Sequence, residues 1–346
     1  MMTCPVEVEE KTVITLSHGS GGRQTSQLIE QVFLPAFGNQ VIQTLHDGAL
    51  LDMNCGQLAF TTDSYVVQPL FFPGGDIGKL AVTGTVNDLA MCGARPQYLS
   101  CGFIIEEGFL LRDLKRIVES MREAAIKSSV EIVTGDTKVV ERQSQEPNIF
   151  INTSGIGRFL CKEPINARSI REGDAIVLSG DVGRHAMAIM AERSGLSFPE
   201  GLESDCAPLF AMVEALLEAE IELHCLRDAT RGGVATALVE LSEQSGMNFS
   251  LFEEKISVSA PVKSACEVLG LDPLHAANEG CFLAFIPQDR AECAQAVLRQ
   301  FSTGKEACVI GQVSGRSSSP RALMHNSLGT QRYLYKLSGD QLPRIC

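Results

Sequence analysis

The sequence predicts an α+β protein of two mixed domains followed by a short flexible tail. Segments typical of strands and helices follow one another in an irregular order, unlike the strict alternation of a doubly wound sheet. Residues 160–173 include Pro164 and have no sustained period, which is typical of a linker, and the pattern restarts after them. The chain has 346 residues, 45% of them hydrophobic, so it is long enough to bury two cores.

The first domain is expected over residues 1–160. Its strands are predicted over 57–67, 98–105, 130–133 and 149–156, and its helices over 23–33, 77–92 and 111–127. The clearest helix is 111–127, because Leu114, Ile117, Val118 and Met121 recur on one face. Residues 134–138, Thr-Gly-Asp-Thr-Lys, are interpreted as a turn that follows a strand.

The second domain is expected over residues 170–337. Strands are predicted over 175–178, 282–285 and 309–313, and helices over 183–193, 208–219, 233–244 and 291–301. Residues 338–346 carry Gly339 and Pro343 without any period, so we expect a tail that is mobile or docked as an extended strap.

Charge and composition exclude several classes of protein. The formal net charge is −13, so we expect a surface that repels nucleic acids and anionic membranes. No apolar run approaches the roughly 18 residues of a membrane span, and no leader-like segment is recognised, so a cytoplasmic location is expected. The twelve cysteines include no C-x-x-C pair and are interpreted as mostly reduced and buried.

Three aspartates stand in apolar or glycine-rich surroundings: Asp63, Asp88 and Asp136. Buried carboxylates need a partner, and Mg²⁺ is a natural one because it prefers oxygen ligands and bridges the phosphates of ATP. The alternative is that each aspartate caps a helix or a turn through its own hydrogen bonds.

Further candidates could serve an anion or a proton transfer. The Gly19–Gly22 turn could let backbone N–H groups approach a phosphate, although it lacks the lysine and spacing of a P-loop and could be only a flexible loop. Lys138 and Glu279 are candidates for charge stabilisation and proton transfer, with a surface salt bridge as the alternative for each. Arg227 and Arg231 flank Asp228, and either share an anion or are solvated beside a capping aspartate.

Cys346 is the last residue of the sequence. An exposed thiol is prone to oxidation, which favours a use for it, although chance would also explain its position. The neighbouring carboxylate would raise its pKa, so its reactivity would need help from Arg344 or from a binding site elsewhere.

Taken together, these segments resemble a superfamily of ATP-using enzymes, the PurM-like proteins, which includes aminoimidazole ribonucleotide synthetase, selenophosphate synthetase and thiamine-monophosphate kinase. Seven ordered motifs are most similar to the HypE family of hydrogenase maturation factors. They are Ser-His-Gly-Ser-Gly-Gly (17–22), Phe-Phe-Pro-Gly-Gly-Asp-Ile-Gly-Lys-Leu (71–80), Gly-Thr-Val-Asn-Asp-Leu-Ala (84–90), Thr-Gly-Asp-Thr-Lys-Val-Val (134–140), Arg-Asp-Ala-Thr-Arg-Gly-Gly-Val (227–234), Ala-Asn-Glu-Gly (277–280) and Pro-Arg-Ile-Cys (343–346).

This resemblance implies a carbamoyl dehydratase. Cys346 would carry a carbamoyl group, and the thiocarboxamide would be dehydrated at the expense of ATP and Mg²⁺ to a thiocyanate, the source of the cyanide ligand of nickel-iron hydrogenase. It implies that Lys138 and Glu279 take part in dehydration. Metal ligands would be Asp63, Asp88, Asp136 and, matching less well, Asp47. Nucleotide contacts would come from Gly19, Ser20, Gly21, Gly22, Lys79, Asn87, Asp88 and Lys138.

The resemblance also implies partners and an assembly. A HypF-type carbamoyltransferase would load Cys346, a HypC-HypD-type scaffold complex would accept the cyanide, and the first domain would pair in a homodimer whose sheets close into a barrel. Two departures from the family pattern are the looser Ser-Gly-Asp-Val-Gly-Arg-His-Ala (179–186) and Cys281 in place of a basic residue. Two alternatives stay open: a small-molecule phosphotransferase or synthetase of the same superfamily, and a non-catalytic ATP-binding scaffold.

Overall fold

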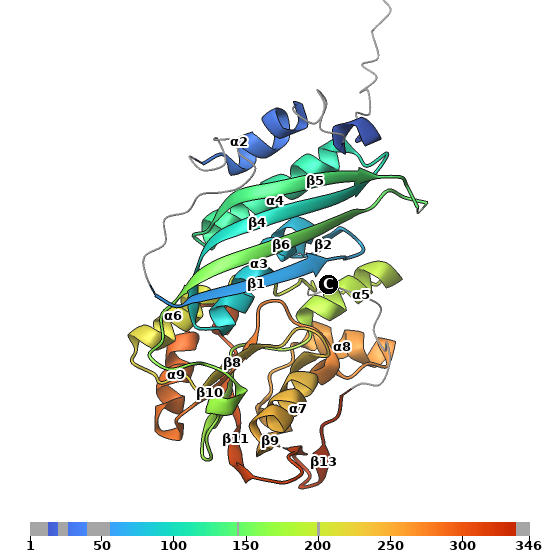
Figure 1. Ribbon diagram of the computed structural model, residues 1–346. Coiled ribbons are helices and arrows are strands. Elements are labelled where there is room, and N and C mark those ends of the chain that lie inside the picture. Colours follow the sequence, from blue (N-terminus) through green and yellow to red (C-terminus); the bar gives the residue numbers. More distant parts are fainter. Residues whose placement is uncertain (1–12, 20–26, 40–55, 144, 199–200, 337–346) are drawn as a thin grey trace, which may run out of the picture.

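The computed structural model describes residues 13–19, 27–39, 56–143, 145–198 and 201–336. Two mixed sheets organise these residues, one of four strands and one of seven. In Figure 1 the four-stranded sheet occupies the upper half of the molecule and the elements after β7 occupy the lower half. The predicted α+β class is therefore confirmed.

The four-stranded sheet has the order β1 (Leu58–Tyr65), β6 (Ile149–Phe159), β4 (Ala94–Glu106), β5 (Glu131–Val140). Its pairs are antiparallel except for the parallel pair of β4 and β5. Helices α3 (Ile77–Met91) and α4 (Leu111–Lys127) lie along one face of the sheet (Figure 1). A two-stranded hairpin of β2 (Phe71–Phe72) and β3 (Gly75–Asp76) leads into α3, and a helical segment composed of Ile29–Phe33 and α2 (Leu34–Phe37) packs near α4.

The two long helices differ because their surroundings differ. In α4 one apolar stripe is buried and the opposite side is charged and exposed, as expected of a helix on the surface. In α3 almost every residue is buried, because the helix lies between the sheet and elements of the second half, including β8 (Cys225–Asp228) and α6 (Phe210–Glu218). A helix with apolar residues on all sides fits that enclosed position.

The seven-stranded sheet has the order β13-β12-β9-β11-β7-β10-β8. Its remaining strands are β7 (Ala175–Leu178), β9 (Met247–Phe252), β10 (Phe282–Ile286), β11 (Cys308–Arg316), β12 (Ala322–His325) and β13 (Gln331–Tyr333). Only β12 and β9 pair in parallel among the described strands of this sheet. Its other helices are α5 (Arg184–Ser194), α7 (Gly233–Ser245), α8 (Ala260–Leu269) and α9 (Ala291–Leu298).

Central strands of this sheet are buried on both faces. In β7 Ile176 and Leu178 join one apolar cluster, whereas Ala175 and Val177 join another on the opposite face. This explains the continuous apolar runs of β7 and β10, which lack the alternation of a half-exposed strand.

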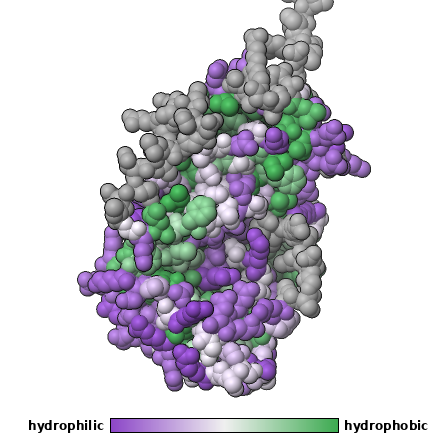
Figure 2. All heavy atoms as spheres, viewed as in Figure 1, coloured by the Kyte–Doolittle hydropathy of each residue, from purple (hydrophilic) through white to green (hydrophobic). Residues whose placement is uncertain are grey.

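The face of the four-stranded sheet away from α3 and α4 is open and partly apolar. Phe60 is 69% exposed, Leu58 51% and Ile104 47%. Figure 2 shows green, apolar side chains gathered on this face, whereas the lower half is mostly purple. We call this surface the open face.

Two expectations about secondary structure were wrong. Residues 134–138 are not a turn but part of β5, which continues to Val140 and pairs with β4 from Glu131 onward. Gly135 makes this possible, since a Cβ there would lie 2.4 Å from the Cys101 carbonyl oxygen. The helix expected over 23–33 continues to Phe37, with Pro35 in the first turn of α2, where proline is tolerated.

The strands β8, β9, β12 and β13 and the helix α8 are additions to the predicted pattern. None of the helices in the described residues is long and apolar enough to cross a membrane.

Candidate functional site

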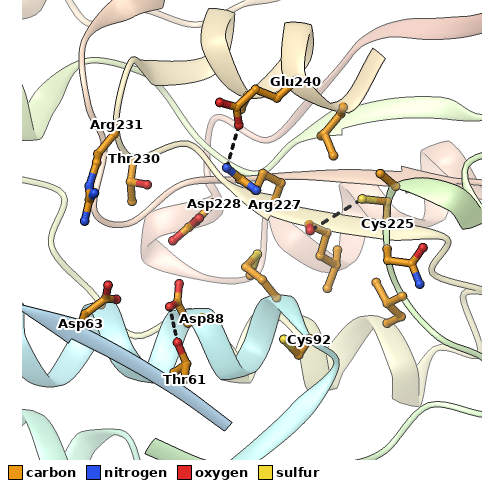
Figure 3. A pocket seen from close by; sticks show the side chains of 18 of the residues that line it. Thr61, Asp63, Asp88, Cys92, Cys225, Arg227, Asp228, Thr230, Arg231 and Glu240 are labelled. Carbon is orange, nitrogen blue, oxygen red and sulfur yellow. Dashed lines mark hydrogen bonds and ion pairs between the residues drawn. The ribbon is translucent and has the colours of Figure 1, made fainter. Parts of the chain in front are cut away.

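A cavity of about 660 Å³ lies where the two sheets' domains meet. It is lined by residues of β1 and α3 from the first half, and of β8, α7 and the linker at 165–167 from the second; Glu279 lines it as well. Figure 3 shows Asp63 and Asp88 pointing into the cavity toward Asp228, which lies on the opposite wall. The cavity therefore gathers carboxyl groups from elements far apart in the sequence.

Asp63 and Asp88 form one side of this cluster. Every second residue of β1 faces α3, among them Thr61, Asp63 and Tyr65. The Thr61 hydroxyl donates to Oδ2 of Asp88 in α3 over 2.7 Å. The Tyr65 hydroxyl donates to Oδ2 of Asp63 over 3.4 Å. Burial and then the neighbouring Asp88 carboxylate raise the pKa of Asp63 to about 6, against a smaller opposing effect of Arg231. Two like charges in one partly buried site require a cation or a proton.

Asp228 and Glu279 form the other side. Asp228 ends β8, and burial, followed by the charge of Asp88, raises its pKa to about 7. Glu279 lies in the bend just before β10 and is 5% exposed. Burial and then the charges of Asp228 and Asp205 raise the pKa of Glu279 well above its usual value. A carboxyl group with a raised pKa holds a proton more strongly than an ordinary carboxyl group, which suits a group that accepts a proton during a reaction.

Two arginines supply the positive charge of the cavity. Arg227 donates to Oε2 of Glu240 in α7 over 2.9 Å, and Arg231 stands on the wall beside Asp63 (Figure 3). Arg231 forms no ion pair within the described part of the chain, so its guanidinium group can bind an anion that enters the cavity.

The structure brings only some of the expected metal ligands together. Asp136 pairs across the sheet with Gly102, which pairs with Asn152, which pairs with Ser64. Directly paired residues point to the same side of a sheet, so Asp136 and Ser64 share the open face, whereas Asp63 points to the other side. Asp136 also lies three strands from β1, about 14 Å at a spacing of ~4.8 Å. Within one chain, therefore, Asp136 does not join Asp63 and Asp88.

Lys138 is two residues beyond Asp136 on β5, so it lies on the same open face, and it is exposed. It is thus separated from Glu279 within one chain.

In the described part of the chain, no group of three or more His, Cys, Asp or Glu side chains is arranged closely enough to hold a metal ion by itself.

Among the described residues, four expected nucleotide contacts lie outside the cavity lining: Gly19, Lys79, Asn87 and Lys138. Lys79, in the first turn of α3, donates from Nζ to the Gly74 carbonyl oxygen over 2.7 Å. Asn87 is 2% exposed, and its amide bonds to backbone atoms of Ala207, Leu209 and Glu279. Gly19 ends a short 3-10 helix over Leu16–Gly19. Ser20, Gly21, Gly22, Asp47 and Cys346 lie outside the described residues.

Some functional residues were missing from the sequence-based site. The sequence suggests Arg227 and Arg231 as anion ligands but gives Asp228 only a capping role, because the four-residue strand β8 that ends at Asp228 is not evident from the pattern. Thr61 is a further residue of the site that no sequence motif indicates. Its position two residues before Asp63 in a strand, hence on the same side, was the available signal.

Comparison with known proteins agrees with this architecture. The family model for the AIR synthase related protein, N-terminal domain, matches residues 45–159, and the model for the C-terminal domain of the same family matches residues 171–320. The chain is 47% identical over 333 residues to the carbamoyl dehydratase HypE of Azotobacter vinelandii, a match that covers 96% of this chain and 97% of that protein.

Solved structures give the same result. A structure of the hydrogenase maturation protein HypE in complex with ATP has a TM-score of 0.92 at 47% identity and covers 96% of this chain and 99% of that chain. A structure of a HypE-HypF complex matches with a TM-score of 0.77 at 47% identity, covering 90% of this chain and 99% of that chain. The phosphotransferase and scaffold alternatives are not favoured by these matches. Both family models match, and a relative is 47% identical over 96% of this chain, so the chain belongs to the HypE family of carbamoyl dehydratases, the AIR synthase-related enzymes of hydrogenase maturation.

Proposed function

We propose that the chain carries a carbamoyl group as a thiocarboxamide on Cys346 and dehydrates it to a thiocyanate with Mg-ATP. The observation that carries the proposal is the gathering of Asp63, Asp88, Asp228 and Glu279 in one cavity. The amide oxygen is a poor leaving group until it receives the γ-phosphoryl group of ATP. The C–O bond then breaks as phosphate leaves, two N–H protons depart, and the C–N bond becomes a nitrile; ADP is the other product.

The residues present fit Mg²⁺ in its usual role. Asp63 and Asp88 offer hard carboxylate oxygens side by side, and the repulsion between them, which together with burial raises the pKa of Asp63, is what a bound cation would relieve. Mg²⁺ is usually held by one or two carboxylates together with the phosphates of its nucleotide, so it does not require a complete cage of side chains. When bound, the ion would neutralise charge on the phosphates. The structure with ATP in the HypE family supports the nucleotide part of this assignment.

Glu279 is proposed as the group that removes a proton from the amide nitrogen. Its side chain lines the cavity, and no hydrogen bond to its carboxyl group is found among the described residues. It faces three other carboxyl groups, so a proton taken from the substrate is well held there. Arg231 is proposed to bind the phosphate that develops opposite Glu279.

The position of Asp136 and Lys138 supports a homodimer. Both lie on the open face, which exposes Phe60 and Ile104. We propose that a second copy covers this face and brings its own Asp136 and Lys138 to the cavity around β1, the edge strand of the sheet, where Lys138 stabilises the phosphorylated amide. Asp47 and the Gly19–Gly22 loop remain proposed contacts of the metal and the phosphates.

The end of the described chain supports access of Cys346 to the cavity. Lys336 donates from Nζ to Oε2 of Glu243 in α7 over 2.5 Å, and Glu240 of the same helix lines the cavity. The ten residues that follow Lys336 can span at most about 33–36 Å when extended, which exceeds the length of α7.

A HypF-type carbamoyltransferase is the proposed donor of the carbamoyl group, which the solved HypE-HypF complex supports. The proposed acceptor of the cyanide is a HypC-HypD-type scaffold complex.

Intact-protein mass spectrometry tests the proposal directly. The chain is incubated with the carbamoyltransferase, its substrates and Mg-ATP, in parallel with Cys346→Ala and Glu279→Gln. A carbamoyl adduct on Cys346 is expected, with loss of one water only when ATP is present. Glu279→Gln should accept the carbamoyl group but retain the water. An adduct that forms equally on Cys346→Ala would remove Cys346 as the carrier.

A further inference from the structure

The bend that carries Glu279 is held by a buried carboxylate on a neighbouring loop. Oδ1 of Asp205 accepts the backbone N–H of Glu279 over 3.1 Å, and Oδ2 accepts the N–H of Gly280 over 3.0 Å. Asp205 is 6% exposed. Both oxygens of this side chain are thus used to hold two successive peptide groups of the bend.

The other side of the bend is fixed by α3. Nδ2 of Asn87 donates to the carbonyl oxygens of Ala207 and Glu279 over 3.1 and 3.4 Å, and Oδ1 of Asn87 accepts the N–H of Leu209 over 2.8 Å. The N–H of Ala207 also donates to the Glu279 carbonyl oxygen over 3.3 Å. One amide therefore ties α3 both to the loop of Asp205 and to the bend of Glu279.

The fit between the loop and the bend is tight. A Cβ built on Gly280 would lie 1.9 Å from the carbonyl oxygen of Asp205, so only glycine permits this approach. The next residue along α3, Asp88, points into the cavity (Figure 3). The same helix thus presents Asn87 to the bend and Asp88 to the reacting groups, which fixes Glu279 relative to Asp88.

A buried carboxylate is a costly way to hold a loop if stability is the only requirement. Removing a charge from water costs several kcal/mol, and neutral side chains of similar size can accept backbone hydrogen bonds at lower cost. Arg184, which pairs with Asp181 over 3.1 Å, offsets part of this cost through its charge. The arrangement is better explained by the precision that two charge-assisted hydrogen bonds give to a single bend.

We infer that Asp205 is a positioning residue for the dehydration, which holds the Glu279 carboxyl in reach of the amide nitrogen while Asn87 ties that position to Asp88. The inference rests on the proposed role of Glu279. Asp205 does not line the cavity, so it acts through the bend and not on the substrate.

The test is a single-turnover experiment on chain already carbamoylated on Cys346. Mg-ATP is added, and the rate of water loss is followed by mass spectrometry at several ATP concentrations. Asp205→Asn is expected to lower the maximal rate about 10- to 100-fold, since a displacement of about 1 Å can cost that much, with the half-saturating ATP concentration within about twofold of wild type. Asp205→Asn keeps the shape of the side chain and one acceptor, so it carries the test if Asp205→Ala does not fold.

Asp174→Asn is the matched control. Asp174 is also a buried aspartate of the second half that accepts a backbone N–H, from Arg171 over 2.8 Å, but it contacts His224 rather than the bend. The melting temperature of Asp174→Asn should fall by about as much as that of Asp205→Asn, whereas its dehydration rate should stay at the wild-type value. In the Glu279→Gln background, adding Asp205→Asn should change the residual rate less than twofold, because a residue that acts through Glu279 has nothing left to position.

The outcomes separate this inference from the proposed function. If Glu279→Gln dehydrates normally, the proposed role of Glu279 is wrong. If Glu279→Gln is strongly slowed but Asp205→Asn and Asp174→Asn have equal rates, or if the effects of Glu279→Gln and Asp205→Asn multiply in the double variant, Asp205 has only a structural role and the inference is overturned.

Discussion

The hydroxyl of Thr61 donates a hydrogen bond to Oδ2 of Asp88 over 2.7 Å, joining β1 to α3 across the wall of the cavity. The bond fixes the Asp88 carboxylate beside Asp63 without supplying a positive charge. Thr61 thus orients Asp88, a proposed metal ligand, but does not neutralise its charge. A bound cation would do that.

Replacing Thr61 by valine removes this bond at nearly constant volume. A hydrogen bond to a charged group contributes about 1.5–3 kcal/mol, so the Mg²⁺ concentration for half-maximal dehydration is expected to rise about tenfold. Magnesium titrations of the mass-spectrometric assay measure this. Thr62→Val, on the same strand but facing the open face, is the control. Equal Mg²⁺ dependence of the two variants would rule out the role given to Thr61.

The raised pKa of Asp228 predicts a pH-dependent stability. Because its pKa is about 7 in the folded chain and lower in the unfolded one, the folded state binds more protons between about pH 4 and 7, and stability falls as the pH rises through that window. Asp228→Asn removes this loss. After allowance for partial exposure, we expect a gain on the order of 2 kcal/mol in the free energy of unfolding at pH 8 and little gain at pH 4.

Urea unfolding in the presence of EDTA at both pH values checks this prediction. Asp289→Asn, on the exposed surface, is the control and should be neutral at both. A gain of equal size at pH 4 would contradict the electrostatic explanation. The dehydration rate of Asp228→Asn, measured in parallel, shows whether the carboxyl group is needed for activity as well.

Most long elements could be predicted from the sequence, whereas the site could be predicted only in part. The helix 111–127 was predicted to the residue, because its single apolar face reports its period directly. The strand β8 was missed because it has four residues, two of them charged, and its burial comes from β10 and α3 rather than from its own pattern. Without β8, Asp228 has no predicted place opposite Asp63.

Local sequence was also misleading at β5. Thr-Gly-Asp-Thr-Lys reads as a turn, but the close approach of β4 at Gly135 and the pairing of the whole segment with β4 keep it extended. The difference matters for function, since an extended backbone places Asp136 and Lys138 together on the open face, away from Glu279. Such a placement depends on the register of three neighbouring strands, which no local pattern contains.

Gly135→Ala tests this register. The new methyl group would meet the Cys101 carbonyl oxygen at 2.4 Å, so β4 and β5 must separate, and we expect a loss of about 1–3 kcal/mol in unfolding free energy. Gly102→Ala, on the partner strand, has no atom closer than 3.8 Å and should cost much less. Thermal unfolding distinguishes the two. Tolerance of Gly135→Ala equal to that of Gly102→Ala would favour a turn over the strand.

The separation of Asp136 from Asp63 within one chain leads to a test of the shared site. If a second copy completes the cavity, each site takes Asp63 from one chain and Asp136 from the other. Asp63→Asn and Asp136→Asn should each be inactive alone.

Mixed dimers formed by co-expression contain one site with both changes and one intact site. Half of the dimers in a statistical mixture are mixed, so about a quarter of the wild-type activity should return. Co-expression that restores no activity, while co-purification of differently tagged chains shows mixed dimers, would show that the site does not combine Asp63 of one chain with Asp136 of the other. Recovery of activity that is lost again in Phe60→Glu, which charges the open face, would identify that face as the surface through which the two copies meet.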